Sequence, residues 1–199
     1  MEMIYSALIG YAFGCINFAY ITGKLYGIDI RDKGSHNAGA SNVTITLGWL
    51  PGVLTALCDI AKGYLAFVVC EHLFGGEICP FLGGAFAVIG HIFPFYMKFK
   101  GGKGFASYAG MCLGISWKLF LAIVVISALI TLITDYIALA TLATVVYVPA
   151  WLYYISKPLA VVLLLVALGV LIFWKHRVNI RNIRNGTEIG LRKRNKNPA

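Results

Sequence analysis

The stretch that decides the fold is residues 104–133, GFASYAGMCLGISWKLFLAIVVISALITLI. It is too long for one membrane span, which needs about 20 apolar residues (roughly 17–25). A polar break at Trp117 and Lys118 divides it into two shorter apolar runs, residues 104–116 and 119–133. Whether the stretch is one helix or two decides on which side of a membrane the rest of the chain lies.

The whole chain has the composition of an integral membrane protein. Its 199 residues are 59% hydrophobic and 13% charged, with a mean hydropathy of +0.79, and a soluble domain carries about twice that charged share. The apolar runs are continuous, which argues against a β-barrel. We expect an all-α integral membrane protein, one domain over residues 1–199, with seven transmembrane helices, some of them short. The expected helices cover residues 3–22, 51–72, 80–97, 104–116, 119–133, 136–155 and 158–174.

The lysines and arginines indicate how the spans are oriented. Two helices in residues 104–133, with the N-terminus outside, put nearly all basic residues on the cytoplasmic side, including the group between Lys175 and Lys196. One helix would put that group outside, against the positive-inside bias. We therefore expect the N-terminus outside and the C-terminus cytoplasmic, with residues 191–199 as a mobile basic tail. The net charge of +9 is then a topology signal, and no nucleic-acid partner is expected.

Three polar segments interrupt the apolar runs, and on this topology all three face the cytoplasm. They are residues 34–42 (GSHNAGASN), 90–104 (GHIFPFYMKFKGGKG) and 176–188 (HRVNIRNIRNGTE). Lipid cannot satisfy the N–H and C=O groups of such backbone, so the segments must line a cavity or an aqueous surface. We expect them to gather into one site at the cytoplasmic rim.

The first two segments have features of anion sites. The small residues of 34–42 permit a turn with converging N–H groups, which binds anions where a helix begins; the alternative is a polar loop that only caps the next helix. Lys103 lies between glycines at a helix start, which favours contact with phosphate, whereas anchoring at the cytoplasmic face explains Lys98 and Lys100. His91 is either a functional group or a histidine that holds the next loop.

The third segment and one apolar run carry spaced polar pairs. His176 and Asn179 are three apart and share a helix face; the alternative, a basic stretch that binds anionic lipid, leaves the histidine and the asparagine unexplained. Asp59 and Lys62 are also three apart, in an apolar run where an unpaired charge is costly. We expect them to pair with each other, or with Lys103 or His91, and to serve as scaffold. No His, Asp or Glu cluster has metal-ligand spacing, so no metal is expected.

The three segments, in this order, resemble the bacterial acyl-phosphate:glycerol-3-phosphate acyltransferase family of integral membrane enzymes, the PlsY type. The family pattern G-S-G-N-x-G-A-T/S-N is similar to residues 34–42 and G-H-x-F-P-x-x-x-x-F-K-G-G-K-G to residues 90–104. The pattern H-R-x-N-I-x-R-x-x-x-G-T-E is similar to residues 176–188, with one residue of slack. Residues 14–20 and the D-x-x-K-G of residues 59–63 are similar as well, so the resemblance covers nearly the whole chain.

This resemblance implies a reaction. Acyl phosphate and sn-glycerol 3-phosphate give 1-acylglycerol 3-phosphate (lysophosphatidate) and inorganic phosphate, the first acylation of phospholipid synthesis. Acyl phosphate is already an activated mixed anhydride, so neither a covalent enzyme intermediate nor a cofactor is expected. The resemblance also implies a multi-pass enzyme of the bacterial cytoplasmic (inner) membrane, with its active site facing the cytoplasm, in contact with membrane lipid and transiently with the soluble enzyme that makes acyl phosphate.

The resemblance further implies roles for single residues. The catalytic residues expected are His176, Asn179 and Ser35. Contact with acyl phosphate is expected from Ser35, Asn37, Gly39, Ser41, Asn42 and Thr141. Contact with glycerol 3-phosphate is expected from Lys103, Gly102 and His91. Structural or supporting roles are expected for Asp59, Lys62, Arg177 and Glu188. The proton of the attacking hydroxyl is expected to pass to the leaving phosphate, with His176 as the alternative acceptor.

Several positions depart from the family pattern. His36 stands where the family has Gly, Ile45 where it usually has a phosphate-binding Arg, and Asp135 where a basic residue is common. The family's Lys after the Gly-Thr-Glu turn is missing. A lost guanidinium removes a charge-assisted bond of about 1.5–3 kcal/mol. The alternatives are a diverged relative that is non-catalytic or takes another phosphorylated acceptor and, from the helices alone, a small-anion transporter.

Overall fold

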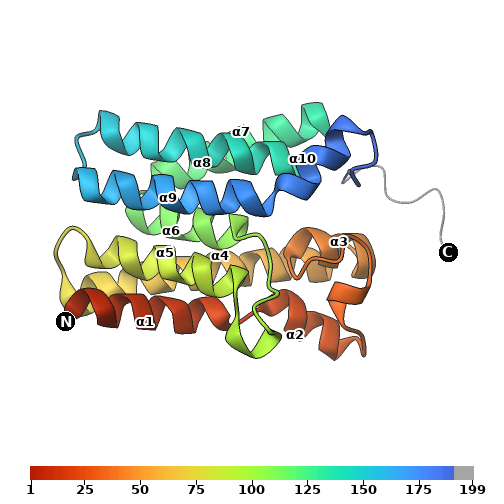
Figure 1. The fold of residues 1–199 in the computed structure, drawn as a ribbon, viewed down its shortest axis with the longest axis horizontal. Coiled ribbons are helices and arrows are strands. Elements are labelled where there is room, and N and C mark those ends of the chain that lie inside the picture. The colour runs from red at the N-terminus through yellow and green to blue at the C-terminus, as the bar shows by residue number, and fades with distance from the viewer. Residues whose placement is uncertain (191–199) are drawn as a thin grey trace. The chain divides into compact units, whose positions relative to one another are not determined.

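The computed structural model describes residues 1–190, and every regular element in that range is a helix (Figure 1). The expected basic tail, residues 191–199, lies outside the described residues. The chain divides into two compact units, Met1–Phe120 and a second one from Leu121 onward. For the described part, the prediction of an all-α protein is confirmed.

The helices follow the predicted apolar runs closely. The first unit contains α1 (Glu2–Cys15), α2 (Phe18–Leu25), η1 (Ile30–Asp32), α3 (Ala40–Leu47), α4 (Trp49–Phe74), α5 (Cys79–Ile92), η2 (Phe95–Met97) and α6 (Phe105–Ile115). The second unit contains most of α7 (Trp117–Thr134), then α8 (Ile137–Tyr154), α9 (Leu159–Lys175) and α10 (Arg177–Arg184). Two of the predicted runs, the first and the third, differ from the structure by a break.

The run predicted as one helix over residues 3–22 is divided into α1 and α2. The side-chain Oδ1 of Asn17 accepts from the N–H of Tyr20 (2.9 Å) and caps α2. The hydroxyl of Tyr96 and the ammonium of Lys62 donate to the two carbonyls at the break (2.9 and 2.8 Å). In a continuous helix these two carbonyls would accept from backbone N–H groups. The side-chain donors take the place of those N–H groups, so the span can break here inside a membrane.

The third predicted helix, residues 80–97, is also shorter in the structure than expected. Pro94 has no N–H and disfavours helical backbone at the residue before it, and α5 accordingly ends at Ile92. The hydroxyl of Tyr11 in α1 donates to the carbonyl of Phe93 (2.8 Å), which secures the turn into η2.

Residues 104–133 form two helices, as predicted. Ser116 separates α6 from α7 with extended backbone, φ −167° and ψ 128°. Its Oγ accepts from the N–H of Leu119 (3.4 Å) near the start of α7. The helix α6 is shorter than a membrane span, and its residues 107–112 are all buried.

Small residues let helices of the first unit approach to backbone contact. Helix α1 packs along α5, and α4 packs on α5 and α6 (Figure 1). A Cβ added to Gly14 would overlap the backbone of Ala87 in α5, and one added to Gly110 would overlap the carbonyl of Ile60 in α4. Such close approach is the usual role of glycine between membrane helices. It sets the spacing of α4 and α5, which carry the buried charges.

The lengths and surfaces of the helices are those of an integral membrane protein. Within residues 1–190, five segments are long and apolar enough to span a membrane, and α9 with α10 is a sixth if the pair, bent by 49°, is one span. The five segments are Glu2–Leu25, Trp49–Phe74, Cys79–Met97, Trp117–Thr134 and Ile137–Tyr154. Apolar side chains on the outside, such as Leu57 and Leu65 of α4, are about half exposed, which fits a surface that faces lipid.

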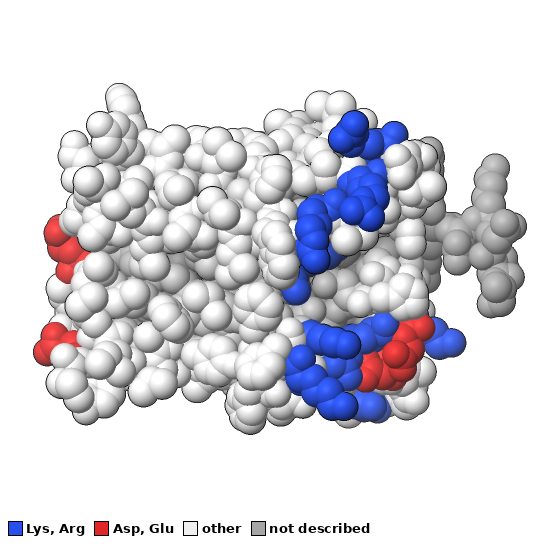
Figure 2. Space-filling model, viewed as in Figure 1, with Lys and Arg blue, Asp and Glu red and all other residues white. Residues whose placement is uncertain are grey.

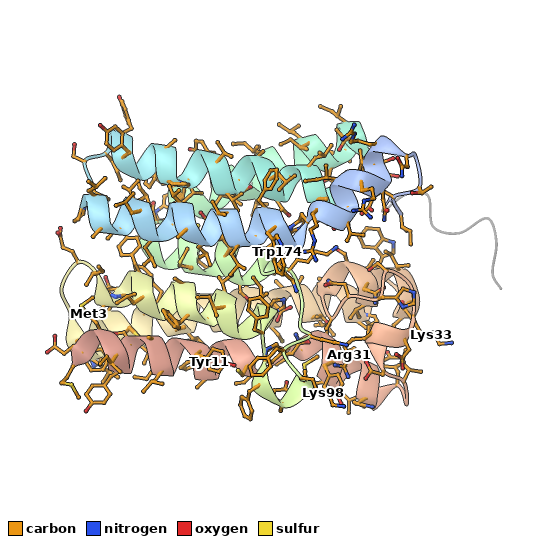
Figure 3. The ribbon with its side chains drawn as sticks, viewed as in Figure 1. Met3, Tyr11, Arg31, Lys33, Lys98 and Trp174 are labelled. Carbon is orange, nitrogen blue, oxygen red and sulfur yellow. The ribbon has the colours of Figure 1, made fainter. Side chains whose placement is uncertain are left out.

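The surface charges of the first unit differ between its two ends on the face that Figure 2 shows. On the face shown in Figure 2, acidic atoms alone lie at the end where the chain begins, and the basic atoms gather at the other end beside a few acidic ones. Figure 3 places Arg31, Lys33 and Lys98 at this basic end, opposite to Met3. The first two polar segments therefore belong to the basic end of the unit.

Candidate active site

The first polar segment forms a tight turn, the glycine loop (residues 34–39), that leads into α3. Gly34 and His36 have left-handed backbone, with φ of 58° and 55°. The side chain of Asn42 is fully buried; it accepts from the N–H of Ser35 (2.7 Å) and donates to two carbonyls of the preceding chain (2.7 and 3.0 Å). Because these bonds use both ends of its carboxamide, Asn42 holds the loop, and its contact with acyl phosphate stays a prediction.

The glycine loop presents the start of α3. Gly39 is the N-cap residue and supplies no side-chain cap, so the first N–H groups of α3 form the kind of helix start that attracts anions. Around it, Ser35 is exposed and Asn37 and Ser41 are half-buried. Ser35, Asn37, Gly39 and Ser41, four of the residues predicted to hold the donor phosphate, thus lie within seven residues of chain that lead into this helix start.

The second polar segment continues into the lysine loop (residues 98–104), which folds back on α5. The N–H groups of Gly101 and Gly102 donate to the last two carbonyls of α5 (3.1 and 3.0 Å). Gly104 has φ 92° and begins α6. Lys103 is half-buried, and it lies between backbone bonded to α5 and the start of a helix.

The two loops meet over a shared core at the basic end of the first unit. Ala38 of the glycine loop and Met97, the residue just before the lysine loop, belong to one buried apolar cluster, which is formed by Ala19, Ile30, Ala38, Val43 and Met97. Arg31 donates to the carbonyl of Met97 (3.1 Å), and Asn17 donates to the carbonyl of Ala38 (3.3 Å). The structure brings the first two polar segments together, as predicted. The third lies in the second unit, and its joining the other two stays a prediction.

Arg31 is held by partners of its own. Its Nε and Nη2 donate to the two carboxylate oxygens of Asp29 (2.9 and 2.7 Å), and its guanidinium lies 5.1 Å from the ring centroid of Tyr20. The bonded guanidinium lowers the pKa of Asp29 to about 2, and Asp29 raises the pKa of Arg31. Because Arg31 also bonds the carbonyl of Met97, it links η1 to η2.

A buried charge cluster lies in α4 and α5, close to the loops. Lys62 pairs with Asp59 one turn earlier (Nζ to Oδ1, 2.8 Å) and bonds the Nδ1 of His91 (2.9 Å). The Nδ1 of His91 lies 3.4 Å from the same carboxylate oxygen. None of the three residues is more than 3% exposed. The predicted pairing of Asp59 with Lys62 is confirmed, and His91 joins it.

Two residues of the loop network, Asn17 and Tyr96, were missed by sequence reasoning. Asn17 is fully buried and joins the α1–α2 break to Ala38. Tyr96 accepts from the N–H of Asn17 (3.3 Å) and donates to the carbonyl of Cys15 (2.9 Å). A lone asparagine inside an apolar run was the available signal for Asn17. No sequence signal distinguishes Tyr96 from the aromatic residues around it.

In the second unit, the third polar segment begins at the bend between α9 and α10. His176 is 3% exposed, and its Nδ1 lies 2.8 Å from the carbonyl oxygen of Ile172. A carbonyl oxygen only accepts, so Nδ1 carries the proton and Nε2 is the basic nitrogen. Arg177 is exposed, and its guanidinium stacks on the ring of Trp174 at 4.2 Å, at the end of α9 (Figure 3).

Asn179 lies three residues after His176 and is nearly buried. Its Nδ2 donates to Oε1 of Glu188. The chain returns to α10 through Gly186, at φ 71°, which brings Glu188 back to this position. The supporting role predicted for Glu188 thus has a bond that accounts for it.

Two further predicted positions lie near the start of α8. Thr141 is fully buried, and its hydroxyl donates to the carbonyl of Ile137 (3.0 Å), so its contact with substrate stays a prediction. Asp135 links α7 and α8 with left-handed backbone, φ 69°. A Cβ added to Gly190 would overlap the carboxylate of Asp135, so the chain after the third segment packs on this residue.

Proteins of known sequence resemble this chain over nearly its whole length. The family model described as glycerol-3-phosphate acyltransferase matches residues 4–186. The glycerol-3-phosphate acyltransferase 1 of Oceanobacillus iheyensis is 40% identical over 191 residues, 92% of each chain. The glycerol-3-phosphate acyltransferase of Carboxydothermus hydrogenoformans is 38% identical over 194 residues, 96% of this chain and 98% of that protein.

Solved structures agree with the sequence relatives. Two crystal structures of PlsY (YgiH), an integral membrane glycerol 3-phosphate acyltransferase, are similar to this chain. The glycerol 3-phosphate form of PlsY matches this chain with a TM-score of 0.89 at 31% identity, with 96% of each chain covered. The lysophosphatidic acid form of PlsY matches with a TM-score of 0.87 at 30% identity, with 96% of this chain and 95% of the PlsY chain covered. This chain therefore belongs to the glycerol-3-phosphate acyltransferase family, of the PlsY type.

Proposed function

We propose that this chain is an enzyme that transfers a fatty acyl group from acyl phosphate to the 1-hydroxyl of sn-glycerol 3-phosphate. The products are lysophosphatidate and inorganic phosphate, the first acylation of phospholipid synthesis. The observation that carries the proposal is the close approach of the lysine loop, at Gly102, to the glycine loop, at Ala38, in a member of this family. Helix starts and lysines suit phosphate groups, and both proposed substrates carry one.

The proposed reaction needs little covalent help from the protein. The acceptor oxygen attacks the acyl carbon and forms the new ester bond, while the bond from that carbon to the phosphate oxygen breaks. The leaving phosphate takes the hydroxyl proton, so atoms and charges balance. Phosphate is a competent base near neutral pH. Positioning of the two substrates and stabilisation of the developing negative charge are then the work of the protein.

The proposed ligands of the acyl phosphate are Ser35, Asn37, Gly39 and Ser41, which surround the start of α3. Backbone N–H groups at this start and the two hydroxyls are donors for phosphate oxygens. Asn42 holds the loop that carries these donors, because its side-chain oxygen accepts from the N–H of Ser35. A direct contact of Asn42 or Thr141 with the donor is kept as part of the proposal.

The proposed ligands of glycerol 3-phosphate are Lys103 and Gly102. An ammonium group beside glycine backbone reaches phosphate without obstruction by a neighbouring side chain. On the face shown in Figure 2, the basic side chains gather at one end, which favours an enzyme with its site at the membrane surface over a transporter with a site at mid-membrane.

His176 and Asn179, with Ser35, are the proposed catalytic residues. The protonated Nδ1 of His176 is bonded to the backbone, so Nε2 is the nitrogen that accepts in this proposal. It is the alternative acceptor for the proton, and it orients the attacking hydroxyl in either case. Glu188 supports Asn179, and Arg177 supports the bend through Trp174.

The proposed setting is the bacterial cytoplasmic membrane, with seven spans, the N-terminus outside and the active site facing the cytoplasm. The seven are the five spanning segments, α9 with α10, and the short α6. The basic end of the first unit then lies inside, in line with the positive-inside bias. Acyl phosphate is proposed to arrive from the soluble enzyme that makes it, and both units are proposed to serve one acyltransferase domain.

The test is an assay of the purified full chain in lipid nanodiscs. Acyl phosphate is supplied with and without glycerol 3-phosphate, and phosphate release and lipid product are followed together. The proposal predicts release that depends on the acceptor, with one lysophosphatidate for each phosphate. Release that ignores the acceptor, or transfer to another phosphorylated alcohol alone, would contradict it; the second outcome would assign Ile45 to a changed acceptor.

A further inference from the structure

The buried charge cluster of α4 and α5 has no part in the proposed chemistry. Asp59, Lys62 and His91 are nearly inaccessible to solvent. Ionisable groups at such positions in membrane helices are costly, and a purely structural contact could be made by apolar residues of similar volume. Their presence therefore calls for a reason beyond helix packing.

The histidine of the cluster lies against the lysine loop, at the point where that loop approaches the glycine loop. The ammonium of Lys62 only donates, so Nδ1 of His91 accepts and the neutral ring carries its proton on Nε2. A Cβ added to Gly102 would overlap this Nε2, so the edge of the ring rests against the lysine loop. The same Cβ would lie 2.7 Å from the carbonyl oxygen of Ala38, in the glycine loop. The ring thus lies where the two loops meet.

Backbone bonds extend this contact on two sides. The carbonyl of His91 accepts from the N–H of Gly102 (3.0 Å), so the ring and the main chain of one histidine both contact one residue of the lysine loop. Lys62 also donates to the carbonyl just before Asn17 (2.8 Å), and Asn17 donates to Ala38 (3.3 Å). The cluster therefore reaches Gly102 directly and Ala38 through Asn17.

We infer that Asp59, Lys62 and His91 are positioning residues for the acceptor phosphate, which hold the lysine loop in register with the glycine loop. The inference rests on the proposed function, because it assigns that loop to glycerol 3-phosphate. Asp59 orients Lys62, Lys62 orients the ring of His91, and the ring sets the place of Gly102 and hence of Lys103. A loop displaced by about 1 Å can cost up to about 100-fold in rate. In this proposal the three residues act through the lysine loop, and the direct contact of His91 with glycerol 3-phosphate that the resemblance implies stays a prediction.

The first experiment replaces His91 by Asn in the full chain. Asn keeps an oxygen that can accept from Lys62 but removes the ring edge from Gly102. The KM for glycerol 3-phosphate is expected to rise by about tenfold or more, while the KM for acyl phosphate and the thermal midpoint stay near the parent values. The matched control is His72→Asn, at an exposed histidine near the other end of α4, which leaves all three quantities unchanged.

A second experiment measures coupling between the ring and the loop. Gly102→Ala is combined with His91→Asn, and binding of glycerol 3-phosphate is measured by calorimetry for both single variants and the double variant. The added methyl overlaps the ring in the parent chain and has more room without it, so the penalty of Gly102→Ala is smaller in the His91→Asn background. If the loss of affinity in the double variant equals the product of the two single losses, the ring and the loop are not coupled and the inference is overturned.

A purely structural role has a different signature. Such a role would lower the thermal midpoint or the fraction of active enzyme and leave the KM for glycerol 3-phosphate unchanged. If His91→Asn does not fold, the pair Asp59→Asn with Lys62→Met removes both charges together and is expected to raise the same KM. Failure of the proposed function itself would appear in the unsubstituted chain, as absence of acceptor-dependent phosphate release; an active parent whose variants keep a normal KM refutes the inference alone.

Discussion

Each unit of this protein contains a buried histidine at a polar segment, and the two are held in opposite ways. His91, in the first unit, is bonded at Nδ1 by the ammonium of Lys62 and has Asp59 beside it. His176, in the second unit, donates from Nδ1 to the carbonyl of Ile172 in its own helix. Both are 3% exposed. Burial alone therefore does not distinguish them.

The bonded nitrogen is what separates their roles. At His176 the backbone takes the N–H and leaves Nε2 basic, which suits a group that accepts a bond from a reacting hydroxyl. At His91 the lysine occupies the acceptor nitrogen, and the N–H side rests on Gly102. We therefore assign chemistry to the histidine of the second unit and positioning to that of the first.

The largest effect is expected from His176→Ala. Loss of an oriented polar group at the reacting centre lowers kcat by about 100- to 1,000-fold. Steady-state kinetics with saturating acyl phosphate and glycerol 3-phosphate measure it. A kcat close to that of the parent chain would remove the distinction between the two histidines.

The next effect is expected from Lys103→Ala, which sharpens the assignment of binding to the first unit. Removal of a charge-assisted bond of about 1.5–3 kcal/mol raises the KM for glycerol 3-phosphate by roughly 10- to 100-fold, with kcat changed far less. The control is Lys100→Ala, an exposed neighbour in the same loop. Equal effects of the two substitutions would indicate attraction by overall charge and contradict a specific phosphate contact.

A smaller effect is expected from Glu188→Gln in the second unit. The substitution keeps the length of the side chain but makes the bond to Asn179 a neutral one, which is weaker by about 1 kcal/mol. We expect kcat to fall by about fivefold with both KM values retained, and Glu71→Gln, at an exposed position of the first unit, to have no effect. A change in the KM for glycerol 3-phosphate would place Glu188 with the binding groups instead.

The smallest effect is expected from Asp29→Asn, which tests how the loops of the first unit are joined. The pKa of Asp29 is lowered to about 2 by Arg31, so the carboxylate contributes at most roughly 2 kcal/mol to stability at neutral pH. Its loss lowers the thermal midpoint by a few degrees, since about 1 kcal/mol corresponds to about 2–4 °C in a chain of this size.

The pH dependence of this difference has a definite sign. A carboxyl with a lowered pKa in the folded state stabilises above its unfolded value and loses that contribution as the pH falls. The gap between the parent chain and Asp29→Asn is therefore constant above about pH 5 and closes as the pH falls towards 2. Thermal unfolding in nanodiscs at several pH values measures it; a gap that widens on acidification would contradict the ion pair.

Most of the fold could be predicted because apolar runs of span length dictate membrane helices directly. The division of residues 104–133 was predictable from charge, and the structure separates the two helices at Ser116. The break at Asn17 was not, because it depends on Tyr96 and Lys62, which donate to the exposed carbonyls from distant parts of the chain. A run that is uniformly apolar does not reveal such partners.

The candidate site was predictable where its pattern is local. The pairing of Asp59 with Lys62 follows from a spacing of three residues, and the turn at residues 34–39 follows from its small residues. The contact of His91 with Gly102 and the bond from Arg31 to the carbonyl of Met97 join residues far apart in sequence. They depend on how close α1, α4 and α5 pack, which side-chain spacing does not encode.

The most direct test of the central claim, that the 1-hydroxyl oxygen of glycerol 3-phosphate becomes the ester oxygen of lysophosphatidate, uses isotopic oxygen. Glycerol 3-phosphate with ¹⁸O in its 1-hydroxyl is incubated with acyl phosphate and the purified chain, and both products are analysed by mass spectrometry. Attack on the acyl carbon predicts that all transferred label appears in the ester of lysophosphatidate and none in the released phosphate. Label-free lysophosphatidate, or phosphate released with no labelled ester formed, would contradict the account.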